Sequence, residues 1–176
     1  MEEKYLAHKD ANTGKEQTLY AHLTETGHKA KDFSAKIGLE KCGELIGLLH
    51  DIGKYSNEFQ SRISGEDIDC DHSTSGSQVL NRLCRIDADG ITKVIYQMMC
   101  VSLMSHHGGL IDVIDQNGSD NYSRRLLKTT DDIYKRGDNI LLKAGEIANS
   151  TQFYEECKNA IRKLNIFSDT KNQEEL

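Results

Sequence analysis

The sequence contains no proline, no tryptophan and no long apolar run. Proline ends or kinks helices, so its absence permits long uninterrupted ones. No segment approaches the roughly 20 apolar residues that a membrane-spanning helix needs. The charged N-terminus also lacks the apolar run of a signal peptide. We therefore expect no membrane association and a cytoplasmic location.

Paired cysteine motifs are absent as well. The five cysteines are scattered and odd in number, and none belongs to a Cys-x-x-Cys pair. This distribution favours neither a disulfide framework nor a thiolate zinc site. We expect free, mostly buried thiols in a reducing compartment.

The chain also lacks an excess of positively charged residues. Its formal net charge is −6 over 176 residues, which argues against a free-standing, non-specific nucleic-acid binder. A nucleic-acid substrate is not excluded, because bound divalent cations would add positive charge where a phosphate sits. A second domain or subunit could supply the rest of a binding groove.

Helical periodicity dominates the sequence and predicts an all-α fold in one domain over residues 1–176. Ser73 or Thr74 is expected to cap the helix that follows His72. The segments 61–71, 87–90 and 115–120 have the composition of loops or turns, and the polar tail 168–176 is expected to fray. Helices are predicted at about 17–36, 40–51, from 73 onward, 91–104, 121–130, 132–148 and 151–164.

Five of the seven histidines occupy positions from which a fold could bring them together. His22 lies on the apolar face of its predicted helix, and His50 with Asp51 ends the next one. His72 begins a helix, and the pair at 106–107 follows another and precedes two glycines. His8 and His28 lack such context and are predicted to be surface residues. The pair at 106–107 consists of His106 and His107.

Polyhistidine ligation with one carboxylate is typical of metal-assisted phosphoester hydrolysis. Asp51 could bind one cation or bridge two by using both of its oxygens. Each residue also has an ordinary alternative when taken alone. His22 could be a satisfied core histidine, the His50–Asp51 pair a helix-end charge pairing, and Lys54 a solvated lysine near a helix C-terminus.

Several segments, taken in order over residues 5–110, resemble the HD-domain nuclease of type I CRISPR systems. This is the nuclease part of the CRISPR-associated nuclease-helicase, within the HD phosphohydrolase superfamily. The resemblance implies an HD-domain helical bundle with a metal site between helix ends. The segments are Tyr5–His8, Leu19–Leu23, Gly47–Lys54 (Gly-Leu-Leu-His-Asp-Ile-Gly-Lys) with Phe59–Gln60, Asp71–Gly76 and Ser105–Leu110.

The resemblance implies two metal ions bridged by Asp51. His22 and His50 would bind the first ion, His72, His106 and His107 the second, and Lys54 would face the scissile phosphate. The family's late aspartate, often in an Ala-Asp-Trp-like context, has no clear counterpart. The later aspartates are Asp131, Asp132, Asp138 and Asp169. Either the chain is a fragment that stops short of this ligand, or the first metal site is weakened.

The implied function is metal-dependent endonuclease or exonuclease cleavage of single-stranded DNA in antiviral CRISPR interference. Histidine-rich ligation suits manganese, iron, cobalt, nickel or zinc better than magnesium. The sequence has no Gly-x-x-x-x-Gly-Lys-Ser/Thr segment, so a helicase domain or subunit would lie elsewhere, together with an RNA-guided surveillance complex. The alternatives are an HD phosphohydrolase acting on a small nucleotide and a non-enzymatic docking module.

Overall fold

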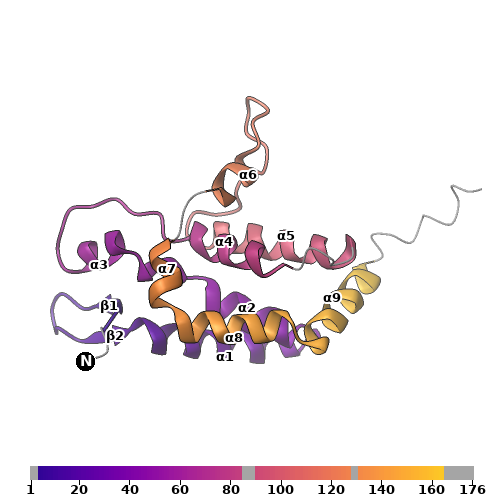
Figure 1. Cartoon of the computed structure of the whole chain (residues 1–176), viewed down its shortest axis with the longest axis horizontal. Helices are drawn as coiled ribbons and strands as arrows, with labels where there is room; N and C mark the ends of the chain where they lie inside the picture. The colour runs from indigo at the N-terminus through magenta and orange to yellow at the C-terminus, as the bar shows by residue number, and fades with distance from the viewer. Residues whose placement is uncertain (1–3, 85–89, 128–130, 165–176) are drawn as a thin grey trace, which may run out of the picture.

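The computed structural model describes residues 4–84, 90–127 and 131–164, and within them the chain is mostly helical, as predicted (Figure 1). The two strands are β1 (Leu6–Lys9) and β2 (Glu16–Thr18). The helices are α1 (Leu19–Ala35), α2 (Glu40–Leu49), the 3-10 helix η1 (Ile52–Tyr55), α3 (Asn57–Ile63), α4 (Thr74–Leu83), α5 (Gly90–Ser105), α6 (Asn121–Leu126), α7 (Asp131–Arg136), α8 (Asp138–Ala148) and α9 (Thr151–Leu164).

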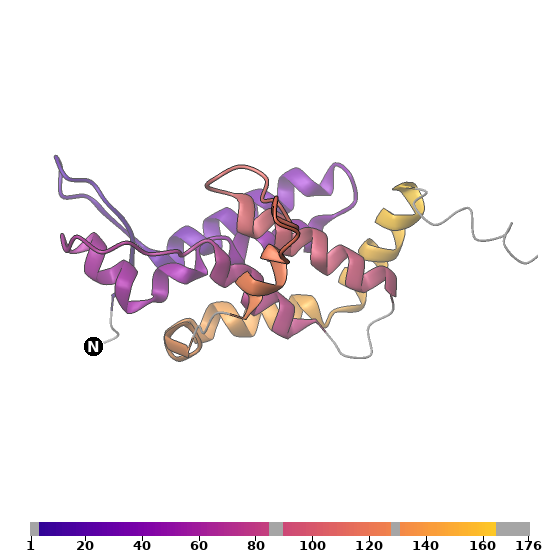
Figure 2. The same cartoon turned by 90° about the horizontal axis from the view of Figure 1, so that it is seen from above.

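The β1–β2 hairpin was not predicted. Its strands pair antiparallel, with Leu6 opposite Thr18 and His8 opposite Gln17. The Asp10 carboxylate accepts the backbone N–H groups of Asn12 and Thr13, at 2.9 and 2.7 Å. Strands this short carry too few residues for a clear alternating pattern. The hairpin extends from one end of the molecule, and α9 lies at the other (Figure 2).

Helices α1 and α2 form the central pair, with α8 alongside and α4 and α5 on the other side (Figure 1). Leu19 and Leu23 of α1 are fully buried, but Phe33, which helical spacing places on the same face, is 70% exposed. Glycines let the two backbones approach closely. A Cβ on Gly47 would stand 2.7 Å from the Gly27 Cα atom and 2.7 Å from the Thr26 carbonyl oxygen.

Helix α9 closes the far end of the core. Phe153 is fully buried and its ring meets that of Tyr96 edge-on, with centroids 5.4 Å apart. The Glu156 carboxylate accepts the backbone N–H groups of Lys41 and Cys42 at 2.7 and 3.1 Å. Because a helix N-terminus leaves its first N–H groups unpaired, this distant carboxylate caps α2 and fixes α9 against it.

Several predicted boundaries are wrong for local reasons. Ser73 occupies the N-cap position of α4, as predicted, but its side chain makes no capping hydrogen bond. The Asp71 carboxylate instead accepts from the Thr74 backbone N–H (3.3 Å) and hydroxyl (2.8 Å). The predicted loop 61–71 begins only after α3, and the helix predicted over 132–148 breaks at Gly137. Helix α6 ends at Leu126. Residues 87–89 and the tail 168–176 lie outside the described residues.

Two expectations drawn from composition can be compared with the structure. The five cysteines, all in the described ranges, form no disulfide, and Cys42, Cys100 and Cys157 are buried while the other two are partly exposed, as predicted. None of the helices in the described ranges is long and apolar enough to cross a membrane.

The close approach of α1 and α2 predicts a stability effect. Gly47→Ala should lower the free energy of unfolding by about 2 kcal/mol, because overpacking outweighs the roughly 1 kcal/mol that alanine gains over glycine in a helix. Gly145→Ala is the control, since its nearest neighbour would be a Leu83 methyl group at 3.9 Å. Urea denaturation measures both. Equal stability of Gly47→Ala and the wild type would contradict the packing described.

Candidate metal centre

Five histidines and one aspartate converge where several helices begin or end. His22 lies in the second turn of α1, and His50 and Asp51 follow α2 directly. His72 lies just before α4, and the doublet His106–His107 follows α5. Four separate segments therefore supply the side chains, as the sequence predicted.

Two glycines explain why the start of α4 meets the end of α2. A Cβ on Gly53 of η1 would collide with the backbone of His72, and a Cβ on Gly76 of α4 would collide with the Leu49 carbonyl oxygen. Only a residue without a side chain permits such backbone contact. Gly53 lies in η1, shortly after the end of α2. Its structural role is to let His72 lie against the segment that carries Asp51.

The two oxygens of Asp51 face different groups of histidines. Oδ2 lies 3.0 Å from His22 Nε2 and 3.3 Å from His50 Nε2. Oδ1 lies 3.3 Å from His106 Nε2 and 3.4 Å from His107 Nε2, with the His72 Nε2 atom at 3.6 Å. The nitrogens also approach one another, at 3.2 Å between His22 and His50 and 2.9 Å between His72 and His107.

Backbone carbonyls set the orientation of two of these rings. His50 Nδ1 donates to the Gly47 carbonyl oxygen at 2.8 Å, and His106 Nδ1 donates to the Leu103 carbonyl oxygen at 2.6 Å. In a neutral imidazole this leaves Nε2 with a lone pair, which here faces an Asp51 oxygen that also carries lone pairs. Such an arrangement is favourable only with a proton or a cation between the atoms, and it is the usual arrangement of metal-ligating histidines.

The described residues therefore contain two groups that could hold a metal ion and that share one carboxylate. The first consists of His22, His50 and Asp51, and the second of Asp51, His106 and His107. His72 adjoins the second group through its contacts with Asp51 and His107. Apart from His72, the two groups contain the residues that the resemblance implied for the two ions, and their binding of metal stays a prediction.

Asp51 is only 3% exposed, and its charge is compensated from several sides. Burial alone would raise the pKa of this carboxyl, but hydrogen bonds from His106, His22 and His50 outweigh it and hold the pKa well below the ordinary range. The Lys54 ammonium lies 2.8 Å from Oδ2. A carboxylate buried without such partners would be costly, so these contacts keep Asp51 ionised.

Lys54 was expected to face a phosphate, or else to be solvated. Its side chain is instead buried, and the ammonium contacts Asp51 and, at 3.4 Å, the Ala7 carbonyl oxygen. Gln60 fixes this region, because its amide nitrogen donates to the Lys54 carbonyl oxygen (2.7 Å) and to that of Leu6 (3.0 Å). Lys54 thus neutralises Asp51 in the absence of a metal ion. Its action on a phosphate stays a prediction.

From the sequence, His8 was predicted to be a surface residue and was not connected to the histidines around Asp51. His8 is exposed, as predicted, but its ring packs edge-on against His22 with centroids 4.9 Å apart. Partial burial and the nearby Lys54 ammonium lower the pKa of His8. Only the hairpin, which was not foreseen, brings it here. His28 is exposed, as predicted.

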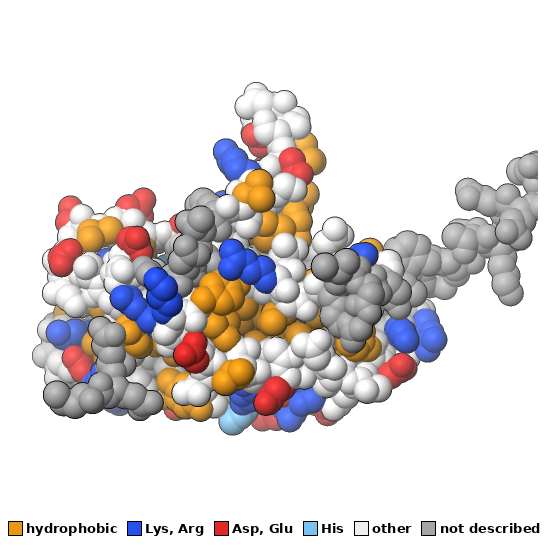
Figure 3. Space-filling model, viewed as in Figure 1, with side chains coloured by type: hydrophobic (Ala, Val, Ile, Leu, Met, Phe, Trp, Pro, Cys, Tyr) orange, Lys and Arg blue, Asp and Glu red, His pale blue; other side chains and the backbone are white. Residues whose placement is uncertain are grey.

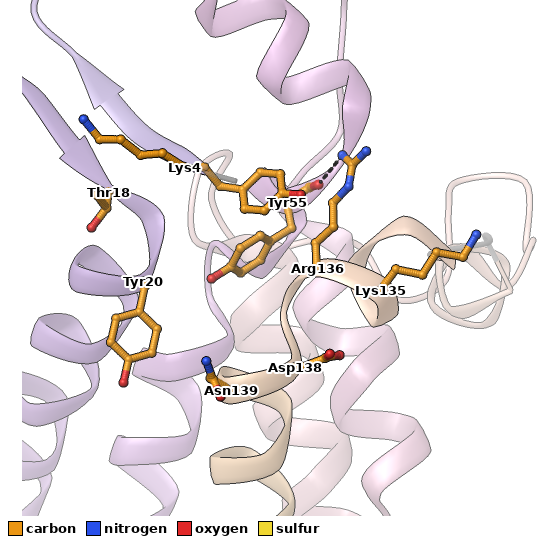
Figure 4. Close-up of a pocket in the computed structure, with 9 residues that line it drawn as sticks. Lys4, Thr18, Tyr20, Tyr55, Lys135, Arg136, Asp138 and Asn139 are labelled. Atoms are coloured by element: carbon orange, nitrogen blue, oxygen red, sulfur yellow. Dashed lines mark hydrogen bonds between the residues drawn. The ribbon is translucent and has the colours of Figure 1, made fainter. Parts of the chain in front are cut away.

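None of the later aspartates joins the centre within the described part of the chain. Asp138 lies in a different cavity, beside Tyr55 and Arg136 (Figure 4). The side chains of Asp131 and Asp132 and the whole of Asp169 lie outside the described residues. Among the described side chains, the first group therefore offers three possible ligands, and the second offers four when His72 is counted.

Comparisons with protein families, with curated proteins and with solved structures returned no match for this chain. The assignment to a class of protein therefore depends on the residues and their geometry.

The unequal ligand sets predict unequal metal affinity. Calorimetric titration with Mn²⁺ should show one tight site and one that is at least about tenfold weaker, since three ligands hold a cation less tightly than four. His22→Ala should remove the weak site and leave the tight one. His28→Ala, an exposed histidine on the same helix, should change neither. Two equally tight sites would contradict the assignment.

The lowered pKa of His72 predicts that the free energy of unfolding of the metal-free protein depends on pH. Burial lowers the pKa of His72 to about 4, so as the pH falls below the ordinary value of about 6.5 the unfolded chain is protonated first. This effect reduces stability progressively between about pH 6.5 and pH 4. The pKa of His106 shifts the other way, because hydrogen bonds to Asp51 and Leu103 outweigh its burial, so its contribution is lost as the pH rises.

Urea denaturation at several pH values isolates the His72 contribution. Between pH 6.5 and pH 4 the wild type should lose on the order of 2 kcal/mol more unfolding free energy than His72→Gln. His28→Gln should behave like the wild type. Parallel curves for the wild type and His72→Gln would show that His72 is not buried as described.

Proposed function

We propose that this protein is a metal-dependent phosphodiester hydrolase of the HD nuclease type that cleaves single-stranded DNA. The observation that carries the proposal is the division of the Asp51 carboxylate between two groups of histidines. One carboxylate shared in this way is what a bridged pair of divalent cations requires. Two such cations would polarise the scissile phosphate and lower the pKa of the attacking water.

The residues of the chain prepare this site in three ways. The Gly47 and Leu103 carbonyl oxygens fix the orientation of two ligating rings. Lys54 keeps the buried Asp51 ionised and therefore able to bind a cation. The side chain of His107 is 51% exposed, which leaves that side of the centre open to solvent and to a substrate phosphate.

Single-stranded DNA is the substrate class that this geometry favours. The ligands come from helix ends and lie partly below the surface, so a phosphate must bend out of its strand to reach them. A flexible single strand can do this more readily than a duplex. The order and type of the motifs also resemble those of the CRISPR nuclease branch. On that resemblance, we propose a helicase domain or subunit and an RNA-guided surveillance complex as partners.

The test is cleavage of circular single-stranded DNA with added Mn²⁺, alongside a panel of free nucleotides. Asp51→Asn should retain less than about a tenth of the wild-type rate, because losing the shared carboxylate costs several kcal/mol of transition-state stabilisation. Asp32→Asn, an exposed aspartate on α1, should retain full activity. Cleavage should stop with chelator and fall below about pH 6, where protons compete with metal for imidazole.

Undiminished cleavage in excess chelator would exclude the metal mechanism. Hydrolysis of free nucleotides without DNA cleavage would instead support the small-nucleotide alternative. A folded protein that binds no metal would support a docking role.

A further inference from the structure

A second cavity lies apart from the histidines, between the start of α1, η1 and the junction of α7 with α8 (Figure 4). Its volume is about 570 Å³, within the range of small-ligand sites. Three tyrosines and three basic residues contribute to its lining, an unusual combination for a chain with a net charge of −6. They are Tyr5, Tyr20, Tyr55, Lys4, Lys135 and Arg136.

The tyrosines form the aromatic part of the cavity. Tyr55 is 4% exposed, and its ring meets that of Tyr5 edge-on with centroids 5.3 Å apart. Tyr20, which also lines the cavity, is 53% exposed. In Figure 4, Tyr20 and Tyr55 lie on two sides of the space between α1 and α8. Exposed tyrosine rings of this kind are platforms on which nucleobases stack.

Basic side chains lie beside the tyrosine rings that line the cavity. Arg136 donates to the Tyr55 carbonyl oxygen at 3.1 Å and to Asn57 Oδ1 at 2.5 Å, and its guanidinium lies 5.4 Å from the centre of the Tyr5 ring. Lys135 is exposed beside it, and basic side chains gather on this face near α7 (Figure 3). Lys4 is paired with Glu16 at 2.8 Å. With Glu16 and Asp138 counted, a single net positive charge remains.

A cavity with one net positive charge and an exposed tyrosine ring suits a nucleotide. Its base would stack on the tyrosine, and its phosphate would lie near Lys135 and Arg136. The cavity also shares its elements with the metal centre. On α1, Tyr20 precedes His22, and on η1, Tyr55 follows Lys54. Residues 20 and 22 point to nearly opposite sides of the helix, because each residue turns it by about 100°. The cavity and the metal centre therefore open on different sides of the first turns of α1.

We propose that this cavity docks one nucleotide of a single-stranded nucleic acid at a distance from the bond that is cut. The proposal rests on the proposed function for the identity of the strand as substrate. The docked nucleotide would lie outside the cleaved phosphodiester and would hold the strand while another segment reaches the histidines. Affinity should then rise with strand length until both sites can be spanned.

Binding can be measured without catalysis. The probe is a fluorescent oligothymidylate of about 12 nucleotides, within the range of single-strand sites, added to the whole chain in EDTA and followed by anisotropy. Tyr20→Ala should weaken binding roughly tenfold through lost stacking, while Tyr20→Phe keeps the ring and should bind like the wild type. Lys135→Glu should weaken binding and reduce its salt dependence.

Matched controls exist on α1 outside the cavity. Phe33→Ala removes an exposed aromatic ring, and Lys29→Glu reverses an exposed charge. Both should bind like the wild type. Thermal melts followed by circular dichroism should show all variants folded, since Tyr20 and Lys135 are exposed. Unchanged affinity of Tyr20→Ala and Lys135→Glu, or no binding by the wild type, would overturn the proposal.

Two further readouts separate this proposal from the proposed function. With Mn²⁺, Tyr20→Ala should hydrolyse the small diester bis(4-nitrophenyl) phosphate at the wild-type rate but show a higher KM for the oligonucleotide. If nothing is hydrolysed while the binding pattern holds, the proposed function fails and the docking site stands. If thymidine monophosphate binds as tightly as the oligonucleotide, the cavity accepts a free nucleotide, which would overturn docking of a strand.

Discussion

The buried charge of Asp51 is the constraint on which the rest of the site depends. A carboxylate that is 3% exposed needs positive or hydrogen-bonding partners on each oxygen. Lys54 and two histidines satisfy Oδ2, and the histidines that follow α5 or precede α4 satisfy Oδ1. The same convergence that stabilises the carboxylate places a set of ring nitrogens where cations could bind. The side chains that stabilise the buried charge of Asp51 are therefore the same ones that could bind a cation.

Close backbone contacts make that convergence feasible. Gly53 and Gly76 allow the start of α4 to touch the segment after α2, and Gly47 allows α1 to approach α2. At each position a Cβ atom would stand less than 3 Å from the backbone of the neighbouring element, so a side chain would force the elements apart. Because His22, Asp51 and His72 lie on these elements, the glycines between them help to set the distances between the candidate ligands.

Local patterns were enough to predict most of the helices and which histidines gather around Asp51. A histidine at a helix end belongs to a short stretch of sequence, and its position could be assigned from apolar spacing around it. The hydrogen bonds from Thr74 to the Asp71 carboxylate at the start of α4 were not predicted, because several polar residues precede that helix and only the fold selects among them. Helical spacing places Phe33 on the apolar face of α1, but it does not show how far along the helix the packing neighbours extend. Gly137 breaks a helix that the apolar spacing alone would continue.

Features that join distant segments could not be predicted in the same way. His8 reaches His22 only through a hairpin of seven strand residues. The tyrosine-lined cavity combines residues near 5, 20 and 55 with the α7–α8 junction. No local pattern in the sequence relates them. Each feature joins β1, or residues near 5, 55 and 135–139, to the helix α1 that carries His22, so the fold had to be known before they could be interpreted.

The central claim is that Asp51 bridges two cation sites, and diffraction from crystals soaked in Mn²⁺ tests it most directly. Anomalous scattering locates the metal without reference to activity. The account predicts a strong peak beside Oδ1 among His72, His106 and His107, and a weaker peak beside Oδ2 next to His22 and His50. Metal bound elsewhere, or no peak beside Asp51, would contradict it.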